Sequence, residues 1–477
     1  MLLLECTKNS KIHNVFIEIR TFCFLFYFQI EDFVEQHGPN LPDGFDTESA
    51  TPLDYFWLMF PVRLIAMIVR YTNSYAAWKQ AREGHDKYWE DVTEPEIRAF
   101  LAVNMVMGIQ QLPQMEMYWS SDPFVGNTGI QQTMTCNRFV KISQYFHVSN
   151  REEEPVRGRE GYDRLFKIRE IMTVLVDTFM QGYTLGREVS VDEAMIRYSG
   201  RLSFRQYMPA KPIKRGVKVW MLCDSNNAYL SKFQFYLGKT NNEREHGLGH
   251  NVVTDITSHI QHTNRWIFFD NFFSGLPLLQ SLIANGLYAC GTIRINRLGF
   301  PAELKKPRDV KNRGDMKILQ LGDSNVTGSA WMDKKHVHHV STLSNPNDVR
   351  DANRRVNREV VQVQQPHSVW SYNKYMGGVD LHDQLRVNYN IGRNGKKWWK
   401  YLFWFLFNCA VVNSYIVYKE VSTRLTKKKR FRHVDFRVEL QRQLIAGYAK
   451  RKRSVGDQLG QNFPLVAQEN MGSSREH

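Results

Sequence analysis

EVSVDEAM, residues 188–195, and RWIFFD, residues 265–270, are the two stretches that decide the fold of this chain. The first alternates into a short strand, and the second is a continuous apolar strand. Each strand leads to an aspartate, Asp192 in the first stretch and Asp270 in the second. The two stretches therefore predict neighbouring parts of one buried sheet, with a carboxylate at the end of each strand.

The segments around these strands predict the rest of an α/β core. Residues 217–223 and 229–237 read as two further strands, which the turn sequence DSNN (224–227) joins into a hairpin. A helix is expected at 276–285, where Gly286 ends it, and a strand at 288–295. Strands and helices in this order indicate an α/β fold with a mixed sheet.

The remaining chain divides by composition and periodicity. The apolar spacing of residues 56–72 predicts a helix, and Thr93 reads as the cap of another. We expect a poorly structured segment (1–50), a mostly helical domain (51–187), a first part of the core (188–296), a polar β-rich insertion (297–366), a second part of the core with a helical extension (367–425) and a basic tail (426–477).

One apolar run is long enough to raise the question of a membrane span. Residues 401–418, YLFWFLFNCAVVNSYIVY, contain no charged side chain over 18 residues. Asn408, Asn413 and Ser414 interrupt the run, and no other segment of comparable length accompanies it. We therefore expect a buried core helix, and no membrane among the partners of the chain.

The net charge points to a polyanionic partner. The 477 residues contain 63 Lys and Arg against 48 Asp and Glu, a formal net charge of +15. Residues 381–477 alone hold 19 Lys and Arg against 7 Asp and Glu. Such an excess favours nucleic acid or an acidic membrane surface as the partner. The six cysteines form no CxxC pair, which argues against a cysteine-rich zinc module and favours reduced, buried thiols.

Four aspartates are the candidate catalytic residues. Asp192 and Asp270 end strands, where a helix cap or a turn residue is the alternative interpretation. Asp380 and Asp383 lie three residues apart on an expected helix and so share one face of it. The alternative interpretation of this pair is a solvated acidic surface of the helix. Together they suggest oxygen ligands for two Mg²⁺ ions, which promote phosphoryl transfer on nucleic acid.

Cationic and aromatic side chains accompany these aspartates. We expect DNA contacts from two clusters of cations. The first follows Asp192 and consists of Lys211, Lys214, Arg215 and Lys218. The second interleaves with Trp398 and Trp399 and consists of Arg393, Lys396, Lys397 and Lys400. Core packing is the alternative for the two tryptophans. Residues 426–432 and 450–453 are basic runs that indicate nuclear localisation or DNA contact, or else a solvated tail.

Three stretches carry a resemblance to a known family. They are VSVDEAMIRYSGRLSFRQYMPAKPIKRGVKVWMLCDS (189–225), FFDNFFSG (268–275) and SYNKYMGGVDLHDQLRVNYNIGRNGKKWWKYLF (371–403). In their order and spacing they resemble the piggyBac family of cut-and-paste DNA transposases, over roughly residues 50–420.

The resemblance implies a specific fold and chemistry. It implies a ribonuclease H-like core interrupted by an insertion, and a helical N-terminal region for DNA binding and dimerisation. Asp192, Asp270 and Asp380 correspond to the catalytic aspartates, with Asp383 as a further acidic residue, and all four hold two Mg²⁺ ions or Mn²⁺ in their place. The implied reaction nicks a strand, forms and reopens a hairpin, and joins the end at TTAA sites.

The same resemblance sets the expected partners and a rival function. It implies a nuclear homodimer that binds double-stranded DNA, both transposon ends and target DNA. Family members often end in a cysteine-rich zinc module, and no cysteine cluster follows Cys409 in this sequence. The rival interpretation is therefore a domesticated, non-catalytic DNA-binding protein derived from a transposase.

Overall fold

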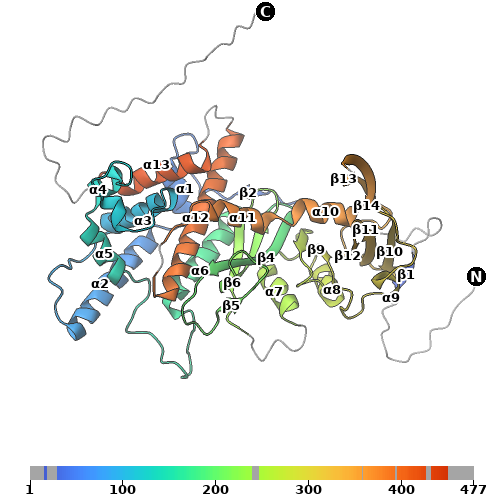
Figure 1. Cartoon of the computed structure of the whole chain (residues 1–477), viewed down its shortest axis with the longest axis horizontal. Helices are drawn as coiled ribbons and strands as arrows, with labels where there is room; N and C mark the ends of the chain where they lie inside the picture. The colour runs from blue at the N-terminus through green and yellow to red at the C-terminus, as the bar shows by residue number, and fades with distance from the viewer. Residues whose placement is uncertain are drawn as a thin grey trace, which may run out of the picture.

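A ten-stranded mixed sheet runs through the middle of the molecule. The structure, a computed structural model, describes residues 16–18, 30–238, 247–356, 358–392, 395–425 and 431–448. Figure 1 shows helices α1–α5, between Pro52 and Tyr145, and α13, His433–Ile445, gathered at one end, and strands β10–β14, between Met316 and Pro366, at the other. The central strands and helices α6–α8 and α10–α12 lie between the two ends.

The centre of the sheet follows the sequence prediction closely. Strand β4 pairs with β6 in antiparallel fashion and with β8 in parallel fashion, while β6 pairs with β7 and β8 with β9. The bounds are β4 Glu188–Arg197, β5 Gln206–Tyr207, β6 Arg215–Asp224, β7 Leu230–Phe235, β8 Trp266–Phe269 and β9 Tyr288–Thr292. The predicted mixed sheet is confirmed.

One boundary in this sheet differs from the prediction. Strand β4 does not stop at Asp192, because antiparallel pairing with β6 continues from Val189 to Arg197. Asp192 therefore lies in the middle of its strand, with a buried side chain, and is neither a cap nor a turn residue. By contrast, Asp270 directly follows the end of β8, as expected.

The polar segment 297–366 extends the same sheet. Antiparallel pairing links β9 to β12, β11, β10 and finally β1, so these strands continue the core sheet at one edge. Strands β13 and β14 form a separate two-stranded ribbon. The bounds are β1 Phe16–Glu18, β10 Met316–Leu321, β11 Thr327–Met332, β12 His336–Ser341, β13 Val349–Val356 and β14 Glu359–Pro366.

Helices build the N-terminal half and cover the sheet. The apolar run at 56–72 breaks at Pro61, since proline cannot continue the hydrogen-bond ladder of a helix. The bounds are α1 Pro52–Met59, α2 Arg63–Glu83, α3 Glu94–Ile109, α4 Thr128–Thr133, α5 Cys136–Tyr145, α6 Phe166–Gln181, α7 Leu248–Ile256, α8 Leu276–Ala284, α9 Ala302–Lys305, α10 His367–Tyr375, α11 Gly378–Val387, α12 Trp398–Arg424 and α13 His433–Ile445.

Helix α12 is the core helix of the molecule. It spans 27 residues and is apolar enough to cross a membrane, as are α1 and α2 together, although these two are bent by 70°. The most apolar window of α12 is 89% buried inside the fold, against α1, α6, α11 and other elements. The polar residues that interrupt the apolar run find partners there: the Asn413 amide bonds both backbone groups of Leu230, and the Ser414 hydroxyl donates to the Ala410 carbonyl. A buried core helix is therefore what the structure contains.

Residues 30–50 differ from the expected poorly structured segment. The Glu31 amide donates to the Tyr288 hydroxyl at 2.8 Å, and Glu35 pairs with the buried Arg265 at 2.6 Å. Strand β2, Gly38–Pro39, pairs with β3, Tyr183–Thr184. These contacts are to residues more than a hundred positions away, so local sequence patterns do not reveal them. The division of the chain into domains stays a prediction.

Candidate active site

Asp192 and Asp270 are brought together by the pairing of β4 with β8. The parallel register places Val191 opposite Phe269, so the next residue on each strand is an aspartate. Neighbouring strands lie about 4.8 Å apart, and residues opposite each other point to the same face. The two carboxylates, 78 positions apart in the sequence, are therefore neighbours on one face of the sheet.

Helix α11 brings Asp380 to the same face. Ser190 lies two residues before Asp192 on β4 and so shares its face. Gly378, the first residue of α11, rests on Ser190, where an added Cβ would lie 2.5 Å from the serine hydroxyl. Asp380 follows in the first turn of the helix and is exposed. Asp192, Asp270 and Asp380 thus border one region between the sheet and α11.

The protein environment disfavours negative charge at this site. Burial raises the pKa of Asp192 to about 7; the Lys211 ammonium opposes this shift, and the Glu193 carboxylate adds to it. Burial also raises the pKa of Asp270, although the backbone amide of Phe272 donates to its carboxylate at 2.8 Å. Carboxylates that are crowded and desolvated in this way are relieved by a bound cation.

Glu193 is a fourth acidic residue of the site that sequence reasoning missed. Its carboxylate lies 3.4 Å from the Lys211 ammonium and 3.7 Å from the Lys218 ammonium. The Glu193 Oε2 atom is buried and has no hydrogen-bond partner among the described residues. The adjacency of two acids in VDE was the available signal, but strand alternation argues against a shared site.

Lys211 and Lys218 therefore belong to the acidic cluster more than to an open DNA surface. The Lys211 ammonium pairs with Glu193 at 3.4 Å, and the Asp192, Glu193 and Asp380 carboxylates favour its charged form. Lys218 is buried, with its ammonium 3.7 Å from the centroid of the Trp220 ring. Burial lowers the pKa of Lys218, and the Glu193 carboxylate opposes that shift. Both cations partly neutralise the acids.

Asp383 lies one turn after Asp380 on α11, with a partner of its own. The Arg386 guanidinium donates to Asp383 at 2.8 Å. Arg386 is itself buried, and it packs over the Phe405 ring at 4.5 Å. An aspartate held in this way has part of its charge satisfied by the protein, which weakens the case for Asp383 as a metal ligand.

The donor set suits a hard divalent cation. Carboxylate oxygens are the ligands that Mg²⁺ and Mn²⁺ prefer, and Asp192, Asp270 and Asp380 all supply them at this site. Across the described residues, no group of three or more His, Cys, Asp or Glu side chains is close enough to hold an ion as the side chains stand. Three acids could therefore hold one ion here only after their side chains move.

The second predicted cationic cluster is divided by the structure. The ammonium groups of Lys397 and Lys400 donate to the Gln144 and Ser143 carbonyls at the C-terminal end of α5. Burial lowers the pKa of Lys400 to about 7 and that of Lys397 to about 8. These two lysines cap a helix whose last carbonyls would otherwise lack partners.

The aromatic pair and the remaining cations are also separated. Trp399 is buried in the core, and Trp398 packs edge-on against Phe204. The Lys396 side chain is exposed. The Lys396 carbonyl accepts a hydrogen bond from the Tyr198 hydroxyl at 3.1 Å, which holds this residue beside the end of β4. Arg393 and the basic runs at 426–430 and 450–453 lie outside the described residues. Lys214 and Arg215 are exposed.

Comparisons with known proteins agree with this geometry. A sequence profile of the transposase IS4 family matches residues 51–415. The chain is 28% identical over 417 residues to human PiggyBac transposable element-derived protein 3. This alignment covers 85% of this chain and 66% of that protein. It is 26% identical over 393 residues to human PiggyBac transposable element-derived protein 2, covering 80% of this chain and 63% of that protein.

A solved structure extends the similarity to three dimensions. The piggyBac transposase, determined by cryo-electron microscopy as a synaptic complex with hairpin DNA, matches with a TM-score of 0.74 and 25% identity. The match covers 87% of this chain and 83% of that one. The profile match over residues 51–415 places the chain in the IS4-type DDE transposase family. Within this class, the chain belongs to the piggyBac transposable element-derived protein family.

Proposed function

We propose that this chain catalyses divalent-metal-dependent cleavage and transfer of DNA strands at a ribonuclease H-like core. The observation that carries the proposal is the register of β4 and β8, which sets Asp192 beside Asp270 under α11. The chain spans 66%, 37% and 63% of the length of three curated relatives that it matches, so the whole-protein activity enters here as a proposal.

The roles of the residues follow from their places. Asp192, Asp270 and Asp380 would hold the ions, with Asp383 and Glu193 as neighbouring acids. When bound, Mg²⁺ or Mn²⁺ activates the attacking oxygen and stabilises the leaving oxygen of a phosphodiester. The burial that raises the pKa of Asp192 keeps its carboxylate out of water and therefore sensitive to added positive charge. Lys211 supplies part of that charge and orients Glu193.

The finer reaction and its setting belong to the same proposal. We propose cut-and-paste transposition with a hairpin intermediate and TTAA targets, in the nucleus, by a homodimer that binds double-stranded transposon ends and target DNA. The match to a piggyBac synaptic complex with hairpin DNA supports DNA as the partner. The exposed cations Lys214, Arg215 and Lys396 are placed to contact its phosphates.

The direct test is metal-dependent nicking. The purified chain is incubated with supercoiled plasmid and Mg²⁺ or Mn²⁺, beside Asp192→Asn, Asp270→Asn and Asp380→Asn. Each substitution keeps the size of the side chain and removes its charge. We expect nicking by the wild type only, with DNA binding retained by all variants. Nicking by the triple variant at the wild-type rate would show that the site lies elsewhere.

Two observations favour the non-catalytic alternative. Lys211 and Lys218 already supply cations to the acidic cluster, and the side chains in the described part of the chain, as they stand, form no three-acid group for an ion. If the wild type binds DNA but its thermal unfolding temperature does not rise with Mg²⁺ or Mn²⁺, the chain is a DNA-binding relative without metal chemistry. A rise that disappears in Asp192→Asn supports the enzyme.

A further inference from the structure

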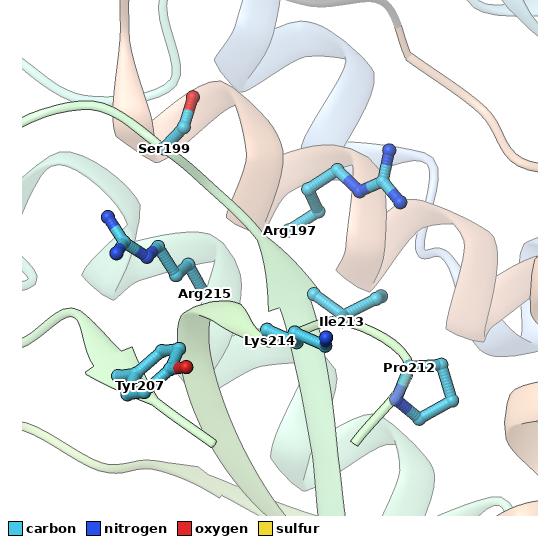
Figure 2. Close-up of a pocket in the computed structure, with 7 residues that line it drawn as sticks. All are labelled: Arg197, Ser199, Tyr207, Pro212, Ile213, Lys214 and Arg215. Carbon is cyan, nitrogen blue, oxygen red and sulfur yellow. The ribbon is translucent and has the colours of Figure 1, made fainter. Parts of the chain in front are cut away.

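A shallow pocket of about 420 Å³ lies at the far end of β4 from the acidic site. Figure 2 shows the residues that line it, which come from the end of β4, from β5, and from the loop that enters β6. Three of them are cationic: Arg197, Lys214 and Arg215. The remainder are Ser199, Tyr207, Pro212 and Ile213.

The three cations lack anionic partners. Arg197, Lys214 and Arg215 are all exposed, and among the described residues none of them forms an ion pair with a carboxylate. By contrast, nearby Lys211 and Lys218 are both paired with Glu193. Like charges gathered without counter-charges cost stability, and a bound phosphate removes that cost.

The backbone around the pocket is held in place. The Tyr198 amide donates to the Arg215 carbonyl at 3.3 Å, and the Met208 amide donates to the Lys214 carbonyl at 2.8 Å. At Gly216 the strands approach so closely that a Cβ would collide with the Ile196 carbonyl. The cations are therefore presented from a fixed backbone, which lowers the entropic cost of binding a ligand.

Tyr207 gives the pocket an exposed aromatic surface. Its side chain is 63% exposed, and the Arg215 guanidinium lies over the ring at 5.4 Å from the centroid. Pro212 and Ile213 add apolar surface to the same pocket. Aromatic side chains beside cations stack on nucleobases, but a base inside a duplex has no free face.

We propose that this pocket binds one nucleotide of an unpaired DNA segment. Tyr207 stacks on its base, Arg215 beside that ring holds its phosphate, and Arg197 and Lys214, which extend to the other side of the pocket, contact the neighbouring phosphate (Figure 2). This inference rests on the proposed function, because it takes DNA as the ligand of the acidic site.

The distance to the acidic site fits such a role. Arg197 lies five residues beyond Asp192 on β4, about 17 Å along the strand. Roughly five nucleotides of one strand cover that length in B-form geometry. Lys396 is fixed beside this end of β4 through its bond to Tyr198, so the positive surface continues past the pocket.

The test compares three DNA probes by fluorescence anisotropy on the full chain. They are a blunt duplex, the same duplex with a five-nucleotide single-stranded overhang, and that overhang with abasic sites in place of bases. We expect the wild type to prefer the base-containing overhang over the abasic one by about five- to 100-fold. Tyr207→Ala should lose this preference and keep its affinity for the blunt duplex, while Tyr207→Phe should retain the preference.

Matched controls separate this site from other surfaces. Tyr88 is 67% exposed and lies beside Lys87 and Lys141, at 5.0 and 5.7 Å from its ring centroid. Tyr88→Ala should therefore leave the preference unchanged, while Arg197→Gln should weaken binding to both overhangs. Equal wild-type affinity for the base-containing and abasic overhangs would overturn the nucleotide pocket and leave the proposed function standing. Absence of binding to every probe would overturn both.

Discussion

Gly378 at the start of α11 rests directly on Ser190 of β4. A Cβ at Gly378 would lie 2.5 Å from the Ser190 hydroxyl and 2.7 Å from the Asp224 carbonyl oxygen. Backbone atoms of a central strand cannot move aside at low cost, so only glycine allows this approach. The distance between Asp380 and the sheet therefore depends on a missing side chain two residues earlier.

Gly378→Ala should push α11 away from β4. We expect a loss of stability of about 1–3 kcal/mol from overpacking and at least a tenfold loss of metal-dependent nicking, because Asp380 moves with the helix. Neighbouring Gly377 has nothing within 4 Å of an added Cβ, so Gly377→Ala is the matched control. Urea unfolding and plasmid nicking measure both effects. Equal behaviour of the two variants would show that the contact does not position Asp380.

The sequence was sufficient to predict the pairing of Asp192 with Asp270, because both lie on apolar strands that enter one buried sheet. It was insufficient for the roles of the cations. Lys400 caps α5 through Ser143, a residue 257 positions away, and such a contact leaves no periodic signal. Glu193 pairs with Lys211 and Lys218, although strand alternation places it on the opposite face of β4 from Asp192. Local sequence patterns therefore predicted the central strands, while long-range packing determined which lysines are exposed and which are bonded within the fold.

Lys396 and Lys400 should differ in their effect on DNA binding. Lys396 is exposed, while Lys400 donates to the Ser143 carbonyl at the end of α5. We expect Lys396→Met to reduce the slope of log affinity against log salt by about 0.9, the value for one phosphate contact. Lys400→Met should leave that slope unchanged. Titrations between 50 and 200 mM salt, roughly the range over which such effects are large, measure it. A loss at Lys400 equal to that at Lys396 would contradict the structural assignment.

His147 should make the fold sensitive to acid. Burial and, to a smaller extent, the neighbouring Lys397, Lys167 and Lys400 ammonium groups together lower its pKa to about 3, against the opposing effect of the Tyr145 carbonyl. Below the ordinary pKa of about 6.5, the unfolded chain therefore binds a proton that the folded chain does not. Stability is then lost as pH falls from 6.5 toward 3, and at pH 5 the loss is on the order of 2 kcal/mol.

His147→Phe removes this titration and keeps a ring against Tyr75, which His147 contacts at 3.5 Å between centroids. We expect the difference in unfolding free energy between pH 7.5 and pH 5 to shrink by on the order of 2 kcal/mol in the variant. His85→Phe, at an exposed position, provides the background for comparison. An unchanged pH dependence in His147→Phe would mean that His147 accepts its proton without unfolding.

Glu96 should be a main determinant of stability in the helical half. Its carboxylate accepts hydrogen bonds from Arg138 Nε at 2.7 Å and from the Tyr448 hydroxyl at 2.8 Å, and so links α3, α5 and the residues after α13. The Glu96 and Arg138 side chains are only 4% and 6% exposed. Glu96→Gln leaves a buried guanidinium without its counter-charge, which typically costs about 3–5 kcal/mol.

A neighbouring acid on the same helix turn provides the control. Glu94 pairs with Arg98 at 3.8 Å, and its side chain is 45% exposed, so Glu94→Gln should change stability by less than about 1 kcal/mol. The double variant Glu96→Gln with Arg138→Met removes both buried charges and should cost less than the sum of the single losses. Urea unfolding of the four variants tests this. Additive losses would show that the two residues stabilise the fold independently, through packing alone, and that the ion pair does not join the helices.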